Sequence, residues 1–152
     1  MSTPIKRNKL LQPISREHHH GLLLSWKIRQ GISKKIDPMR MKKYVDWFFE
    51  NHLIPHFAFE EKYIFTILDP KHELIVKALS DHRRLQRLAN DEKNVGNSLS
   101  LFEEELEQHI RFEERILFKE VQEHATAEDW EKLENQHHDE TFVDNTSDEF
   151  WK

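Results

Sequence analysis

The sequence FENHLIPHFAFEEKYIF, residues 49–65, is matched without a gap by FEEELEQHIRFEERILF, residues 102–118. Both copies contain His-x-x-Phe-Glu-Glu, so His56 corresponds to His109 and Glu60 corresponds to Glu113. On an α-helix, side chains four positions apart lie on the same face, about 6 Å from each other. Each copy therefore presents an imidazole and a carboxylate from one helical face, which is the arrangement that metal sites in the cores of helix bundles require.

The composition favours a helical protein with no nucleic-acid partner. The chain has 152 residues, three Gly, five Pro and 34% charged residues, which suit one helical domain. Its net charge of -5 with interspersed signs provides no basic patch. No apolar run approaches the ~18 residues that cross a membrane. The basic start is not followed by the apolar region of a signal peptide, so we expect a cytoplasmic protein without a membrane partner. The absence of cysteine excludes disulfides, thiolate metal sites and a cysteine nucleophile.

Apolar periodicity and capping signals divide the chain into four long helices and a short fifth one. Ser15 is the predicted cap of the first helix, Asp37-Pro38 and Asp69-Pro70 open the next two, and Thr126 caps the last. Pro55 lies inside the second predicted helix and should kink it. The predicted helices cover about residues 15–31, 38–68, 70–93, 98–124 and 126–137.

Short connections between long helices predict an all-α fold, an antiparallel up-down-up-down four-helix bundle with a short C-terminal extra helix and tail. We assign residues 1–138 to the bundle domain and residues 139–152 to an acidic C-terminal tail without periodicity. Phe142, Phe150 and Trp151 are the tail residues able to dock on the bundle.

A single His-x-x-x-Glu pair is weak evidence for a metal site, because eleven histidines produce such pairs by chance. Repetition inside matching apolar frames is stronger, since His56 and His109 each follow a Phe and a Leu on a helical stripe. Imidazoles and carboxylates placed in a core without partners would cost several kcal/mol each. Metal coordination removes that cost, so the repeat predicts a metal site that includes His56, Glu60, His109 and Glu113.

The first and third helices offer the remaining ligands. His82 lies on the apolar stripe of the third helix, where the alternative is a core histidine bonded to a backbone carbonyl. In the first helix, His18, His19 and His20 point about 100° apart, so only one of them should reach the site. We expect His19, with His18 as the alternative, because His19 shares its face with the apolar residues Leu22, Leu23 and Trp26.

The order of these residues resembles the hemerythrin-like, or HHE cation-binding, family over about residues 15–120. The resemblance rests on His19, His56-x-x-x-Glu60-Glu61, His82 and His109-x-x-x-Glu113-Glu114. It implies a four-helix bundle that holds two Fe ions as an oxo- or hydroxo-bridged di-iron centre, with Zn or Mn as substitutes. It further implies Glu60 and Glu113 as bridging ligands, and His19 or His18, His56, His82 and His109 as terminal ligands.

One departure from the family pattern bears on function. Oxygen-carrying hemerythrins have a second histidine four residues after the one on the third helix, and this chain has Gln86 there, which we expect on the core face. Fewer protein ligands would leave more room for a small ligand such as O2 or NO. The resemblance therefore implies a protein that binds or senses a diatomic ligand or handles iron, and it favours a metal- and ligand-binding protein over a turnover enzyme.

Two alternatives stay open. A di-iron oxidase or peroxidase would be expected to have more carboxylates and Glu-x-x-His spacing on its helices. A bundle that holds another divalent metal structurally would use the same histidines.

Overall fold

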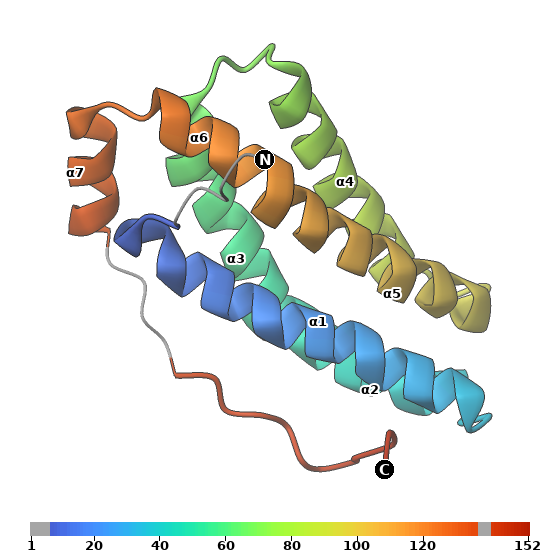
Figure 1. Cartoon of the computed structure of the whole chain (residues 1–152). Coiled ribbons are helices and arrows are strands. Elements are labelled where there is room, and N and C mark those ends of the chain that lie inside the picture. Colours follow the sequence, from blue (N-terminus) through green and yellow to red (C-terminus); the bar gives the residue numbers. More distant parts are fainter. Residues whose placement is uncertain (1–6, 137–140) are drawn as a thin grey trace, which may run out of the picture.

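The computed structural model describes residues 7–136 and 141–152, which form helices and no strand (Figure 1). The predicted all-α fold is therefore confirmed, and the long helices pack together as a bundle. Within the described ranges, no helix combines the length and the apolar character that crossing a membrane would require.

Helix α1 (Gln12–Ser33) begins three residues before the predicted start. A 3-10 turn, η1 (Lys9–Leu11), leads directly into it, and the side chain of Asn8 accepts a hydrogen bond from the Leu10 amide in that turn. Pro13 occupies the first turn of α1, where its missing amide donor costs nothing. Ser15 is therefore inside the helix and is not its cap.

The second long helical segment is continuous from Pro38 to Ile67 but changes its winding along the way. The side chain of Asp37 caps it by accepting a hydrogen bond from the Met39 amide, as the Asp-Pro signal predicts. A π-helical turn ends at Leu53, two residues before Pro55, whose ring removes a backbone donor. The kink expected at Pro55 stays a prediction. The segment consists of α2 (Pro38–Phe48), the π turn η2 (Phe49–Leu53), α3 (Ile54–Phe59), the π turn η3 (Glu60–Ile64) and the 3-10 turn η4 (Phe65–Ile67).

The remaining helices follow the predicted order with shifted starts. Helix α4 (Glu73–Asn90) is capped by His72, because Asp69-Pro70 forms a separate turn in front of it. A second long segment comprises α5 (Val95–Phe112), the π turn η5 (Glu113–Leu117) and α6 (Phe118–His124). Helix α7 (Ala127–Asn135) is capped by Thr126, as predicted, and the expected end near His137 lies outside the described residues.

The sequence repeat extends to the backbone. The π turns η3 and η5 each comprise five residues, and they begin at the equivalent residues Glu60 and Glu113. A π turn winds the backbone more loosely than an α-helix and often occurs at functional sites. Both copies of the motif therefore have the same local irregularity at the carboxylate.

Two separate apolar clusters build the core, and the polar side chains of the motif lie between them. On α1, Ile14 belongs to one cluster and Leu24 to the other, with His18 between them in sequence. On α4, Ala78 and Leu85 are divided in the same way by His82. The two halves of the core therefore enclose a polar layer across the bundle.

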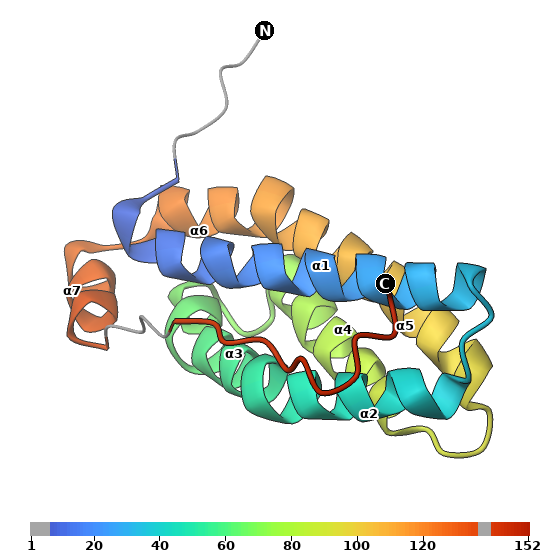
Figure 2. The ribbon, with the colours of Figure 1, turned by 90° about the horizontal axis from the view of Figure 1, so that it is seen from below.

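The C-terminal segment, residues 141–152, lies along α1 and α2 (Figure 2). The side chains of Phe150 and Trp151 are buried in the apolar cluster that contains Leu24. The ammonium group of Lys27 on α1 lies 2.7 Å from the carboxylate of Asp144 and donates to it. This segment is packed and not loose, and the proposed boundary between residues 138 and 139 falls outside the described residues.

We expect Phe150→Ala to lower the free energy of unfolding by about 3–5 kcal/mol, because it removes a fully buried ring from the core. Urea unfolding followed by circular dichroism measures this loss. Val143→Ala, on the same segment but 72% exposed, is the matched control and should change stability by less than about 0.5 kcal/mol. Equal stability of the two variants would contradict the docking of the segment.

Candidate metal centre

Six side chains from four helical segments meet in the polar layer of the bundle. The histidines come from α1, α3, α4 and α5, and the two glutamates begin the π turns η3 and η5. All six are buried, and both glutamates have no exposed surface at all. The six residues, called the His/Glu cluster or simply the cluster below, are His18, His56, Glu60, His82, His109 and Glu113.

The six side chains form two groups that share both glutamates. In the first group His18 and His56 face Glu60 and Glu113, and in the second group His82 and His109 face the same pair. Within each group the candidate ligand atoms all lie within 4.8 Å of one another. The arrangement is therefore two adjacent four-ligand sites with common carboxylates.

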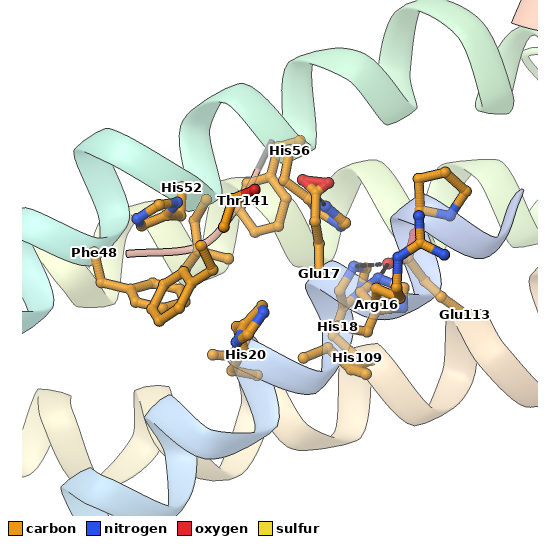
Figure 3. Close-up of a pocket in the computed structure, with 17 residues that line it drawn as sticks. Arg16, Glu17, His18, His20, Phe48, His52, His56, His109, Glu113 and Thr141 are labelled. Atoms are coloured by element: carbon orange, nitrogen blue, oxygen red, sulfur yellow. Dashed lines mark hydrogen bonds and ion pairs between the residues drawn. The ribbon is translucent and has the colours of Figure 1, made fainter. Parts of the chain in front are cut away.

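The Nε2 atom of every histidine points at a shared carboxylate. The Nε2 atoms of His18 and His109 both lie 3.1 Å from Oε1 of Glu113 (Figure 3). Those of His56 and His82 lie 3.2 Å and 3.3 Å from Oε1 of Glu60. Four imidazoles thus converge on two carboxylates from four directions.

The preference for His19 over His18 is wrong. The side chain of His19 is exposed, whereas His18 is buried beside Glu113. Leu23 and Trp26, on which the preference was based, are 39% and 44% exposed. Three consecutive leucines cover more than half of the helix circumference, so their positions could not establish which side of α1 faces the core.

Gln86 is also not where the pattern placed it. Its side chain is exposed, because the buried face of α4 passes through His82, Leu85 and Ala89 and leaves position 86 outside. Gln86 therefore does not occupy the place of a missing ligand in the cluster.

A second carboxylate accompanies each histidine at its other ring nitrogen. Glu61 Oε2 lies 2.8 Å from Nδ1 of His82, and Asp81 Oδ2 lies 2.9 Å from Nδ1 of His109. The corresponding distances are longer at the other two histidines, 3.5 Å for Glu17 and His56 and 3.6 Å for Glu114 and His18. A carboxylate at Nδ1 orients the ring and leaves Nε2 to bind a metal, which is the usual partner arrangement of metal-binding histidines.

These four residues, called the outer carboxylates below, connect the helices in a closed ring. Glu17 on α1 contacts His56 on α3, and Glu61 on η3 contacts His82 on α4. Asp81 on α4 contacts His109 on α5, and Glu114 on η5 contacts His18 on α1. Each of them is the sequence neighbour of a residue in the cluster. Each histidine is therefore oriented by a carboxylate from the preceding helical segment of the ring.

Sequence reasoning named Glu61 and Glu114 as parts of the two motif copies, and in the structure they lie beside the Nδ1 atoms of His82 and His18. It missed Glu17 and Asp81. The available signal was their position directly before His18 and His82, but carboxylates are frequent in this chain and adjacency alone does not identify a contact between helices.

The cluster strongly perturbs the acidity of its members. Burial alone would lower the pKa of His56 and of His109. Glu60 and Glu17 outweigh it at His56, and Glu113, Asp81 and Glu60 outweigh it at His109, so each pKa is raised to about 9. The pKa values of His18 and His82 are also raised against burial by neighbouring carboxylates. Burial would raise the pKa of Glu60, yet its histidine neighbours, His56 foremost, hold that pKa well below its usual range. The carboxylates therefore strongly favour positive charge in the cluster.

The ligand set fits a pair of divalent cations. Both oxygens of Glu60 and one oxygen of Glu113 are buried without a hydrogen bond, as are the Nε2 atoms of His82 and His109. Unpaired buried carboxylate oxygens are costly, and coordination of a cation is the interaction that satisfies them. Six carboxylates around four imidazoles supply ample negative charge for two such cations.

We expect Asp81→Asn to lower the pKa of His109 in the metal-free protein, because the variant removes a negative charge 2.9 Å from Nδ1. NMR titration of the imidazole measures this. A pKa raised above 6.5 means that the pair stabilises the fold fully below about pH 6.5 and loses this contribution as the pH rises through about 9. Asp81→Asn should therefore reduce the loss of stability between these pH values.

Asp46→Asn is the matched control, since Asp46 pairs with Lys42 through an exposed carboxylate away from the cluster. It should leave the titration of His109 unchanged. The same pKa in Asp81→Asn as in the wild type would show that Asp81 does not act on His109.

Comparison with known proteins identifies no relative that could assign this centre. No family model matches the chain, and neither the curated proteins nor the solved structures include a significant match. The chemistry of the centre is therefore inferred from its ligands, geometry and charge.

Proposed function

We propose that this protein binds two iron ions in the His/Glu cluster and, through them, a small diatomic ligand such as O2 or NO. The observation that supports it most is the sharing of Glu60 and Glu113 by two histidine pairs. A carboxylate between two cation positions can bind one with each oxygen, whereas a single ion cannot use all six side chains at normal coordination distances. The proposal includes the hemerythrin-like family and the up-down-up-down order of four helices, with α1 and α4 both packed against α5.

The mixture of ligands favours iron over the alternatives. Imidazole nitrogens suit iron and zinc, and carboxylates suit harder cations. A structural zinc site is usually closed by four ligands in a tetrahedron, and this cluster offers two linked sets. When bound, iron would supply the redox-active centre at which a small ligand attaches.

The residues of the protein have two roles in this proposal: to bind the ions and to orient the imidazole rings. Four Nε2 atoms and two carboxylates would hold the ions, while the outer carboxylates fix the imidazole rings. The two apolar clusters on either side of the layer lower the local dielectric constant, which strengthens the attraction between carboxylates and cations. These properties suit a binding or sensing protein, and no side chain in the cluster is assigned to turnover.

We expect about two iron ions per chain after anaerobic loading with Fe(II), because two ligand sets are present. Elemental analysis after gel filtration gives the stoichiometry, and absorbance after exposure to air or NO reports on ligand binding. A stoichiometry near one ion, or selective retention of zinc in competition with iron, would contradict the di-iron proposal.

Glu60→Gln should abolish binding of both ions, because Glu60 belongs to both ligand sets. Glu61→Gln should weaken binding by only about 10–100-fold, since its carboxylate orients His82 and does not enter the cluster. Competition with a chromogenic chelator measures both affinities. Glu128→Gln, at an exposed position on α7, is the control and should bind like the wild type. A larger loss in Glu61→Gln than in Glu60→Gln would exclude the proposed roles.

A further inference from the structure

A cavity of about 260 Å³ extends from the cluster toward the C-terminal segment. It begins at His18 and His56 and passes between α1 and the segment formed by η2 and α3, where His20 and His52 lie on opposite sides (Figure 3). Its inner wall is mixed: Arg16, Glu17 and Glu113 contribute charged groups beside the imidazoles, and the large apolar residues are Phe48, Leu53, Phe57, Leu106 and Ile110. Its outer wall includes Thr141 and Phe142.

The cavity reaches the two halves of the cluster unequally. His18 and His56, the two histidines of the first set, both line the cavity. Of the two histidines of the second set, only His109 does. Neither His82 nor Glu60 is part of its wall. A molecule in the cavity would therefore meet the His18–His56 position first.

The internal repeat is broken on this side of the bundle. His52 replaces the equivalent Glu105, and η2 is a π turn where the second copy continues as the α-helix α5. Glu105 pairs with Arg84 and ties α5 to α4, whereas the ring of His52 packs against Phe142 at 4.8 Å between centroids. The two copies of the repeat therefore differ at the residues that lie beside the cavity.

Phe142 lines the cavity and packs between two helical segments. Its ring stacks on His20 of α1 with centroids 4.1 Å apart and an interplanar angle of 16°. The segment that carries it is held by Asp144, which accepts from Lys27, and by the buried residues Phe150 and Trp151. An aromatic side chain is thus held in the wall of the cavity that leads to His18 and His56.

We infer that diatomic ligands enter the centre through this cavity, and that Phe142 limits the size of what passes. The inference rests on the proposed function and adds the route and a size limit. Arg16 and the imidazoles of the wall offer partners to polar and charged groups, so the selection that we infer is by size. A ring held in place from both sides admits a diatomic molecule more readily than a branched one.

Stopped-flow mixing of Fe(II)-loaded protein with NO or with tert-butyl isocyanide tests the size limit. In Phe142→Ala the association rate of the isocyanide should rise by about tenfold or more, while that of NO changes much less, because only the larger probe is restricted. Phe142→Trp, which adds volume, should slow the isocyanide. Val143→Ala is the matched control, since that exposed neighbour does not line the cavity, and its rates should equal those of the wild type.

Unchanged isocyanide rates in both Phe142 variants, or the same increase in Val143→Ala, would overturn the inference. Xenon binding to the metal-free protein separates this failure from failure of the proposed function, because it needs no iron. Methyl NMR signals of Leu53, Leu106 and Ile110 should shift with xenon pressure in the wild type. Saturation should require higher pressure in Phe142→Ala, which loses wall contacts, and not in Val143→Ala. Methyl signals that ignore xenon would overturn the route whether or not iron binds.

Discussion

Glu60 and Glu113 are carboxylates without exposed surface, placed at the centre of a bundle between two apolar clusters. Removing such charges from water is tolerated only where cations or strong donors surround them. Four imidazoles meet this demand by directing Nε2 at the two carboxylates from four helical segments. The positions of the helices relative to one another are thus coupled to the pairing of two buried charges.

A ring of outer carboxylates extends this constraint to the surface of the polar layer. Each outer carboxylate stands beside one cluster residue in sequence and serves a histidine of the next segment, so the inner and outer contacts support each other. The π turns at Glu60 and Glu113 repeat the same device in both halves of the chain. Each half of the chain therefore supplies two histidines, one glutamate and two orienting carboxylates to the cluster.

The C-terminal segment breaks this symmetry. It packs on α1 and α2 through Phe150 and Trp151, and it places Phe142 against His20 and His52. One side of the cluster therefore lies beside a cavity whose wall includes the ring of Phe142, while on the other side Arg84 and Glu105 link α4 to α5. A centre with nearly equivalent ligands can in this way become inequivalent toward small molecules.

The helical fold and five of the six cluster residues could be predicted from the sequence, because the repeat places His56 and Glu60 in the same apolar frame as His109 and Glu113, and the stripe of α4 includes His82. The other features of the site arise from the packing of the helices. The choice of His18 depends on which side of α1 faces the core, and apolar residues all round that helix do not specify it. The roles of Glu17 and Asp81 depend on contacts between helices, and the docking of residues 141–152 depends on α1 and α2 lying side by side. Periodicity describes one helix at a time, whereas these features exist only after the helices have packed.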